Sequence, residues 1–254
     1  CDGGLGFAME SLKDCSLDAS GVLHRVTPQG DHVLWSVTLV ARPVTCSERR
    51  WAFGLQATPV RPLPEGSSAW ITANYERGRD TDFVRFAKDL VFSCIWSQWE
   101  FDKPETRWLD HFCDPMGVKT DKLRAHVEAC RAAGSPAIAY YAPLNFTDDA
   151  RPEHTLYAAE WMIAPRRRWK ALDFIQSRAC TRSSYQDFLL FAFRRAMREA
   201  GLDGLYFDGA TSGECANLSH GCGWTDANGT VHPVWPILAD REFNKRVAVL
   251  LHEE

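Results

Sequence analysis

The order of apolar and polar positions divides the chain into two regions. Up to about residue 62, short runs rich in β-branched and aromatic residues, such as HVLWSVTLVARP at 32–43 and RRWAFGLQATPV at 49–60, alternate partly between apolar and polar positions. This period is typical of strands with one buried face. The residues PQGD at 28–31 predict a turn. We therefore expect residues 1–62 to be β-structure, forming the last strands of a β-sandwich domain.

After a proline-rich linker at 60–68, helical patterns alternate with continuous apolar runs. The predicted strands lie at 89–100, 135–144 and 204–209, and the predicted helices lie at 81–89, 119–134, 187–201 and 235–251. Strands that alternate with helices imply a parallel sheet, and its strands are apolar throughout because both faces are covered. The second region is therefore predicted to be an α/β domain.

Two large α/β architectures fit this alternation: a doubly wound sheet and a (β/α)8 barrel. No G-x-G-x-x-G and no G-x-x-x-x-G-K sequence follows a strand, so the nucleotide-binding version loses its main support. A barrel takes about 250 residues, which is more than residues 63–254 supply. The chain also begins at Cys1 rather than Met and ends at Glu254 inside a helical pattern. We expect a fragment that carries the first half of a (β/α)8 barrel.

Local signals mark the ends of two elements. Ser184 and Asp187 form an S-x-x-D pattern, which predicts a capping box at the start of the helix at 187–201. Gly201 is expected to end that helix. Asn228 followed by Gly229 predicts a type I′ hairpin.

Composition and charge narrow the function classes. A net charge of −4 and a pI near 6.1 argue against a general nucleic-acid-binding protein. No apolar run approaches the ~20 residues of a membrane-spanning helix. The ten Trp residues either fill a large core or provide stacking surfaces for sugar rings.

The candidate chemistry lies where strands end, because barrel sites form at the C-terminal ends of the strands. Three predicted strands end in aromatic residues and carboxylates, namely Trp96, Trp99 and Glu100, then Tyr140 and Tyr141, then Tyr206 and Asp208. Aromatic walls and paired acids suit glycoside hydrolysis, in which one acid protonates the leaving oxygen and the other acts as nucleophile, base or orienting group. Asp208 is the first candidate, with a helix cap or a loop-ordering acid as its alternative role. Glu100 and Glu214 compete for the second.

The long loop at 209–236 follows Asp208, and loops of this length tend to be functional. From it Asn217, His220 and Trp224, with Arg241 of the next helix, are the predicted substrate-binding residues. A zinc set of Cys180, Cys215, His220 and Cys222 is an alternative, but C-x4-H-x-C is no familiar zinc spacing. A Cys215–Cys222 or Cys180-linked disulfide is the expectation for an exported protein. We expect no metal and no cofactor.

Four blocks carry a family resemblance: WAFGLQATPVRPLP at 51–64, DGLYFDG at 203–209, ECANLSHGCGW at 214–224 and PILADREFNKRV at 236–247. Together with the segments between them, they resemble bacterial proteins of the glycoside hydrolase family 123-like group over roughly residues 35–252. The resemblance implies a β-sandwich followed by a (β/α)8 barrel, a glycan substrate, and a secreted or periplasmic location.

The characterised branch of that family is similar to N-acetylgalactosaminidases, in which a neighbouring Asp-Glu pair acts with assistance from the substrate. In this chain Asp208 is followed by Gly209. The resemblance therefore carries over only Asp208, and neither the acid–base residue nor the sugar specificity.

Three functional hypotheses remain open. The first is a glycoside hydrolase that uses Asp208. The second is a carbohydrate-binding barrel without catalysis, motivated by the missing Asp-Glu pair. The third is a metal-dependent hydrolase that uses the Cys/His loop.

Overall fold

The structure is a computed structural model, and it describes most of the two ends of the chain and parts of its middle. The described residues are 3–45, 48–58, 65, 71–75, 93–97, 124, 127–128, 130–132, 134, 136–141, 146–148, 152–171, 174–207 and 213–254. The chain divides into two compact units, Cys1–Val60 and Arg61–Glu254, whereas the sequence analysis put the boundary at 62/63. None of the helices in these described ranges is both long and apolar enough to cross a membrane.

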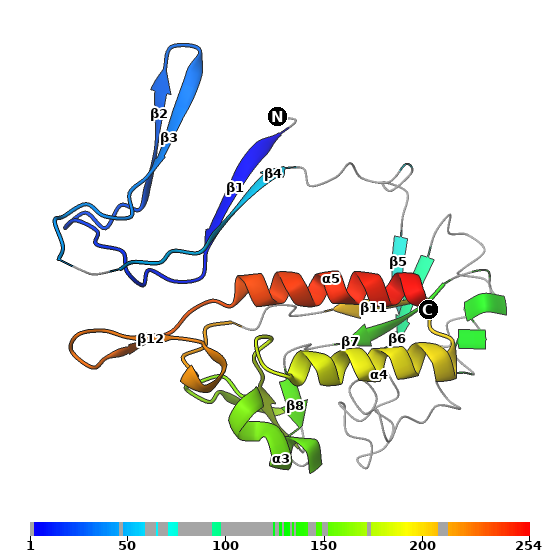
Figure 1. The fold of residues 1–254 in the computed structure, drawn as a ribbon. Helices are drawn as coiled ribbons and strands as arrows, with labels where there is room; N and C mark the ends of the chain where they lie inside the picture. The colour runs from blue at the N-terminus through cyan, green and yellow to red at the C-terminus, as the bar shows by residue number, and fades with distance from the viewer. Residues whose placement is uncertain are drawn as a thin grey trace. The chain divides into compact units, whose positions relative to one another are not determined.

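The first unit consists of antiparallel strand pairs (Figure 1). Strand β1 (Gly4–Met9) pairs with β4 (Phe53–Thr58), and β2 (His24–Gln29) pairs with β3 (His32–Val37). The turn between β2 and β3 contains Gly30, within the segment predicted to turn. The β-structure of this region is thus confirmed.

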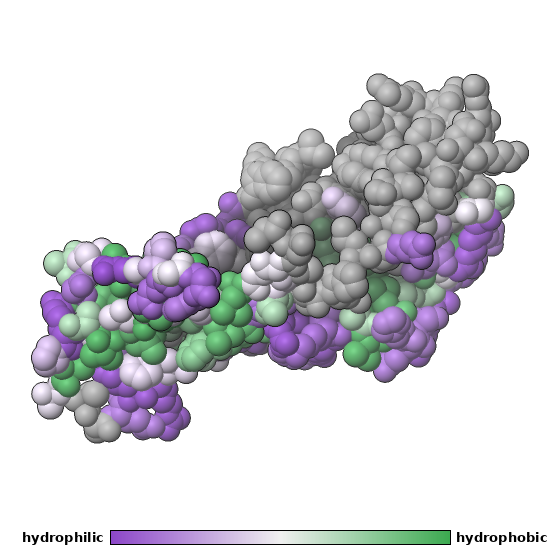
Figure 2. Space-filling view, turned by 90° about the horizontal axis from the view of Figure 1, so that it is seen from above, coloured by the Kyte–Doolittle hydropathy of each residue, from purple (hydrophilic) through white to green (hydrophobic). Residues whose placement is uncertain are grey.

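An aromatic contact joins these two strand pairs. The ring of Phe7 on β1 lies 5.4 Å from the ring of Trp35 on β3 and stacks on Phe53 at 5.7 Å. Apolar side chains nevertheless remain at the surface, and both Val26 and Val33 are 61% exposed. Figure 2 shows apolar residues, in green, among the hydrophilic ones on the visible surface. Residues 3–45 and 48–58 therefore form two small sheets, and the β-sandwich stays a prediction.

The second unit contains a four-stranded parallel sheet. Strands β5 (Ile71–Tyr75), β6 (Ser93–Ser97), β7 (Ala137–Tyr141) and β11 (Gly204–Phe207) lie side by side in the order β5-β6-β7-β11. The parallel sheet is confirmed, and β5 is an additional strand that the sequence analysis did not predict. Among these four strands, spatial order follows chain order, as it does around a barrel. A closed barrel is not formed by the described strands and stays a prediction.

A small antiparallel sheet lies in the connection between β7 and β11. It consists of β8 (Phe146–Asp148), β10 (Phe174–Arg178) and β9 (Arg168–Ala171), in the order β8-β10-β9. Helix α3 (Pro152–Trp161) lies between β8 and β9 in the chain. None of these elements was predicted. The strand sequences FTD, RWKA and FIQSR mix apolar with polar or charged residues, so they lack the continuous apolar runs that indicated β7 and β11.

The two long helices pack on strand β11, one before it in the chain and one after it (Figure 1). Helix α4 (Tyr185–Ala200) contributes Phe193, whose ring stacks on Phe207 of β11 at 5.5 Å. Helix α5 (Ile237–Glu253) contributes Phe243, 6.2 Å from the same ring. Both helices are confirmed, as is the helical state of residues 124, 127–128 and 130–132 in the segment 119–134. The linker at 60–68, apart from Glu65, and the predicted helix at 81–89 lie outside the described residues.

Ion pairs show that α4 and α5 run in the same direction. Asp187 near the start of α4 pairs with Arg246 of α5 at 2.6 Å, and Arg194 further along pairs with Glu253 at 2.6 Å. Helices that connect successive parallel strands must share a direction, because each returns the chain to the same edge of the sheet. The described helices and strands therefore have one consistent α/β arrangement.

The capping box predicted for α4 is wrong, although the helix begins and ends near the predicted residues. Ser184 has helical dihedral angles and makes no side-chain cap. Its Oγ instead donates to Glu160 Oε2 at 2.8 Å and accepts from Trp161 Nε1 at 2.9 Å. These contacts with α3 have replaced the local side-chain cap that the sequence predicted for α4. At the other end, Gly201 has a φ of 76° and ends the helix as predicted.

The core assignment of α5 gives a stability prediction. Leu250 is 3% exposed in the main core, so Leu250→Ala should lower the free energy of unfolding by about 2–5 kcal/mol. The neighbouring Leu251 is 37% exposed, and Leu251→Ala should cost less than about 1 kcal/mol. Urea unfolding followed by circular dichroism measures both losses. Equal losses would contradict the assigned inner face of α5.

Candidate functional site

The parallel sheet brings several predicted site residues to one edge. Tyr141 ends β7 and Phe207 ends β11, and the register places these two residues opposite each other. Tyr140 and Tyr206 form the preceding pair, and Trp96 lies one residue before the end of β6. Because parallel strands end at the same side of a sheet, the two pairs of β7 and β11 lie along one edge, whereas the register places Trp96 opposite Ile138, two residues before Tyr140. Asp208 follows β11 directly in the chain, but Asp208, Glu100 and Trp99 lie outside the described residues.

Glu214 and Arg241 are both found in exposed ion pairs. Glu214 Oε2 lies 3.8 Å from Arg167 Nη2, and its side chain is 44% exposed. Arg241 Nη1 lies 2.7 Å from Glu242 Oε1, which Lys245 also contacts. Hydrogen bonding to Lys245 lowers the pKa of Glu242, with the charges of Lys245 and Arg241 adding to the effect. The side chains of Glu214 and Arg241 are 44% and 59% exposed, so both are accessible to a ligand.

Trp224 belongs to a hairpin in the loop after Asp208. Strand β12 (Trp224–Thr225) pairs with β13 (Val231–His232), and the Trp224 ring stacks on the His232 ring at 4.4 Å. His232 Nε2 lies 2.9 Å from Asp226 Oδ2, and this hydrogen bond lowers the pKa of Asp226. One face of Trp224 is thus already covered by His232.

The hairpin prediction is confirmed, but its turn type is wrong. Residues 226–230 connect the two strands, and a type I′ turn needs positive φ at both central residues. Gly229 has a φ of 82°, whereas Asp14 is the single non-glycine residue with positive φ in the described part of the chain. Asp226 Oδ1 organises the turn instead, because it accepts hydrogen bonds from the backbone N–H groups of Asn228 and Thr230 at 2.9 Å.

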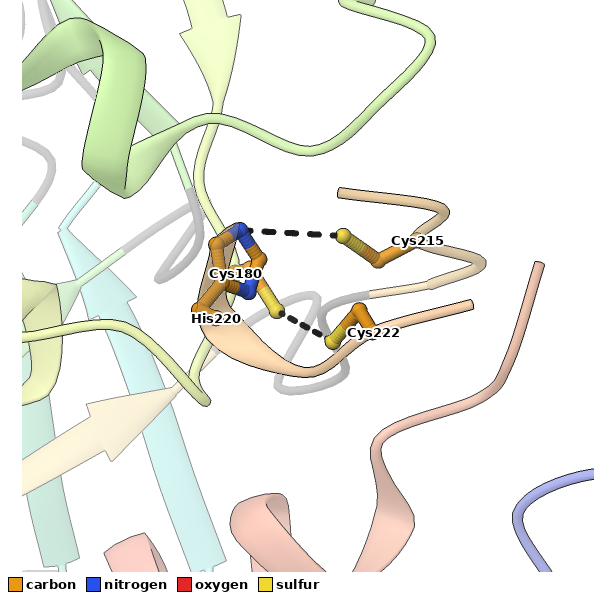
Figure 3. Close-up of side chains that lie close together, drawn as sticks. All are labelled: Cys180, Cys215, His220 and Cys222. Carbon is orange, nitrogen blue, oxygen red and sulfur yellow. Dashed lines mark hydrogen bonds between the residues drawn. The ribbon is translucent and has the colours of Figure 1, made fainter. Parts of the chain in front are cut away.

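The densest group of reactive side chains is a cluster that we call the Cys/His cluster, made of Cys180, Cys215, His220 and Cys222 (Figure 3). One ligand atom from each residue lies within 4.8 Å of all the others. The sulfur atoms of Cys180 and Cys222 are 3.6 Å apart, and Cys215 Sγ lies 4.0 Å from His220 Nε2. All three cysteines are 0% exposed. The sequence analysis named this set only as an alternative.

Separate parts of the chain position the members of the cluster. Cys180 follows β10, and its N–H donates to the carbonyl of Trp161 at 2.8 Å. Cys215 exchanges two backbone hydrogen bonds of 2.9 Å with Val234. His220 ends the short 3-10 helix η3 (Leu218–His220). The cluster therefore joins the segment before α4 to both ends of the loop after β11.

The side chain of Asn217 stabilises the turn between Cys215 and His220. Its Oδ1 accepts from Ser219 N at 3.0 Å, which caps η3, and its Nδ2 donates to the carbonyls of Met162 at 2.9 Å and Ala159 at 3.2 Å. The amide is thus occupied inside the protein. Asn217 and His220 were predicted to bind substrate, and the structure gives both side chains partners inside the protein, which for both include the carbonyl of Met162.

Two glycines flank Cys222 and explain the sequence HGCGW. Gly221 and Gly223 have φ values of 73° and 83°. A Cβ atom on Gly223 would lie 2.9 Å from both the Cα of Ala216 and the carbonyl oxygen of His232. Only glycine fits this position without a shift of the surrounding backbone. The close approach folds the loop back on itself and carries Cys222 to the other ligands.

Within the cluster, neighbouring groups shift the pKa values of the residues in different directions. Hydrogen bonds from Cys180 and Cys222 hold the pKa of Cys215 well below its ordinary value. Hydrogen bonds with Cys215 and Cys222, together with burial, raise the pKa of Cys180. Burial opposes charge on His220, but hydrogen bonds to Cys215 and Cys222 outweigh it and raise its pKa to about 10. Without a bound ion, the set favours a Cys215 thiolate beside a charged His220.

A thiolate beside an imidazolium is also the arrangement of a nucleophilic cysteine. A catalytic thiolate must be reached by its substrate, however, and reactive cysteines are partly exposed. Cys215 is fully buried. The cysteines are also free rather than oxidised, so the disulfide expected between Cys215, Cys222 or Cys180 is not formed.

A groove of about 480 Å³ lies between α4 and α5, away from these residues. It is lined by Phe191, Val249 and charged side chains that include Asp187 and Arg246. None of the predicted site residues lines it, so the groove does not form part of the candidate site.

Comparisons with known proteins give distant structural neighbours. No family model and no curated protein matches the chain. An α-galactosidase from Thermus thermophilus in complex with p-nitrophenyl α-D-galactopyranoside is 12% identical with a TM-score of 0.48, and the match covers 98% of this chain and 48% of that one. An α-N-acetylgalactosaminidase from Bifidobacterium bifidum is 13% identical with a TM-score of 0.43, and the match covers 72% of this chain and 31% of that one.

A third neighbour is an α-galactosidase from Lactobacillus brevis, 14% identical with a TM-score of 0.35, for which the match covers 49% of this chain and 17% of that one. All three neighbours are glycosidases by name, and this chain spans less than half the length of each. The resemblance to the glycoside hydrolase family 123-like group stays a prediction.

The close approach at Gly223 gives a prediction with a matched control. Gly223→Ala and Gly229→Ala both place a Cβ at a φ near 83°, which costs about 1–2 kcal/mol in each case. Only Gly223 adds backbone contacts at 2.9 Å, whereas Gly229 faces open space. Gly223→Ala should therefore be clearly the more destabilising in thermal unfolding, and it should increase the reactivity of the cysteines toward Ellman's reagent. Equal effects of the two substitutions would contradict the described loop.

Proposed function

We propose that the chain is part of a glycoside hydrolase in which Asp208 is a catalytic carboxylate. The observation that supports this most is the order and direction of β5, β6, β7 and β11, which run parallel in chain order. In such a sheet the chemistry gathers at the strand ends. In the sequence, Asp208 comes directly after Phe207, the last residue of β11, whose register partner is Tyr141.

The proposal assigns a role to each type of residue at this edge. The aromatic residues form apolar surfaces on which a sugar ring stacks, and Tyr206 is 38% exposed at its position on β11. Asp208 acts as a nucleophile, as a base, or as a group that orients the substrate, and a second acid protonates the leaving oxygen. Glu214 is a candidate for that second role because it is accessible and lies in the same loop. Glu100, which follows β6 in the chain, is the other.

The alternative functions have less support. A metal-dependent hydrolase needs an open coordination position, whereas the Cys/His cluster offers four buried or half-buried protein ligands, which is a complete tetrahedral set. A carbohydrate-binding barrel without catalysis would share the strand-end aromatic residues. Its distinguishing property is sugar binding without turnover. A secreted or periplasmic location accompanies the glycosidase proposal, because large glycans are met outside the cytoplasm.

The test compares two aspartates at opposite ends of β11 in the protein of full natural length. Asp208→Asn should reduce the turnover of aryl glycosides by about 10²–10⁴-fold, because it removes a group that acts in the transition state. Asp203, the control, lies before β11, where its carboxylate accepts from the N–H of Ala137 at 2.8 Å and pairs with Arg131 at 3.0 Å. Asp203→Asn should change stability but leave turnover per folded molecule within a few-fold.

The outcomes separate the hypotheses. Turnover that Asp208→Asn leaves unchanged would move the chemistry to another residue. Sugar binding in both the parent and Asp208→Asn, with no turnover in the parent on a broad panel of glycosides, would overturn the enzyme proposal in favour of the binding protein.

A further inference from the structure

We propose that Cys180, Cys215, His220 and Cys222 bind a single zinc ion that stabilises the loop following Asp208. This proposal does not depend on the proposed function, because it concerns a group that takes no part in the chemistry at the strand ends.

The distances fit one tetrahedral ion. Sulfur ligands at about 2.3 Å from zinc lie about 3.8 Å from each other across the tetrahedron. The Cys180 and Cys222 sulfurs are 3.6 Å apart. The largest separation in the set is 4.8 Å, so a small inward movement would complete the coordination sphere. A disulfide requires about 2.05 Å between sulfurs and would use only two of the four groups.

The types of ligand atom indicate which metal ion the site would bind. Three thiolates and one imidazole are soft or borderline ligands, which favour zinc over calcium or magnesium, since these require oxygen. Four protein ligands fill a tetrahedral ion and leave no position for water or substrate. The site is therefore structural rather than catalytic. Zinc has no redox chemistry of its own, so it would hold the thiols in the reduced state in which they are found.

The surrounding hydrogen bonds are those of a metal ligand shell. The backbone N–H of Asn217 donates to Cys215 Sγ at 3.4 Å, which stabilises negative charge on the sulfur. His220 Nε2 lies 3.4 Å from the carbonyl oxygen of Met162, whereas the buried Nδ1 has no hydrogen-bond partner in the described part of the chain. Ligating histidines commonly donate their second ring N–H to a carbonyl. Zinc at Nδ1, with Nε2–H held by Met162, would satisfy both nitrogens.

The core around the cluster is too small to order the loop by apolar packing alone. It contains Ile163, Cys180, Cys215, Cys222 and Val234, with Trp224 packed against it. Three of the five buried members are cysteines, and the helices and strands in the described part of the loop, 213–236, are the short helix η3 and two strands of two residues. A metal bound by ligands from separate segments would stabilise such a loop, because its binding free energy adds to the folding free energy. Zinc is the crosslink that uses all four groups.

The first test measures metal in the purified protein of full natural length, prepared without an affinity tag that binds metal. Elemental analysis should find about one zinc per chain, as expected for a closed four-ligand site. Replacing the zinc by cobalt(II) should give the visible absorption of a tetrahedral thiolate complex. Less than about 0.2 zinc per chain after incubation with zinc salt under reducing conditions would overturn the proposal. So would stoichiometric iron in its place, or a disulfide between any two of these cysteines.

The second test assigns the ligands. Cys222→Ser should lower bound zinc from about one to below about 0.2 per chain and make the loop sensitive to protease. The control is Cys15→Ser, because Cys15 is a free, partly exposed cysteine of the first unit, and it should leave the zinc content unchanged. If Cys222→Ser does not fold, removal of zinc from the parent by a chelator should produce the same protease cleavage within 213–236. Full zinc retention in Cys222→Ser, or an uncleaved loop after zinc removal, would contradict the assignment.

Discussion

The loop after β11 depends on one constraint, the convergence of three cysteines and a histidine from segments 42 positions apart in the sequence. Cys180 is fixed by the small sheet before α4, while Cys215, His220 and Cys222 come from the loop itself. The loop has little regular structure of its own, and its core is small. Its path is set by this contact, by the cap at Asn217 and by the glycines beside Cys222. A group that binds all four side chains would fix the loop that begins next to Asp208.

The parallel sheet supplies the second constraint, since it determines where a substrate would meet the chain. Strands β5, β6, β7 and β11 end on one edge, and α4 and α5 pack on β11 through Phe193 and Phe243. This packing fixes the strand that leads to Asp208. The proposed functions of the two regions are therefore distinct. In these proposals the strand edge carries the chemistry, and the Cys/His cluster stabilises the loop that follows Asp208.

Elements with long apolar patterns could be predicted from the sequence, and features that depend on distant contacts could not. Helices α4 and α5 could be predicted because each segment has a helical period of apolar residues. Strands β6, β7 and β11 of the parallel sheet could be predicted because each lies in a continuous apolar run. The capping box at Ser184 failed because Glu160, 24 positions earlier, competes for the same hydroxyl. The cluster was undervalued for a similar reason. Spacing along the chain says nothing about Cys180, which reaches the loop only after a strand, a helix and another strand have folded. The glycines around Cys222 were the local signal that was overlooked.

The most direct measurement is X-ray absorption at the zinc edge of the purified protein. The account predicts a first shell of three sulfur atoms at about 2.3 Å and one nitrogen atom at about 2.0–2.1 Å from the ion. A shell of nitrogen and oxygen atoms alone would show that the zinc is bound elsewhere on the protein. A sample that contains no zinc to measure, even when it is prepared with zinc under reducing conditions, would contradict the account altogether.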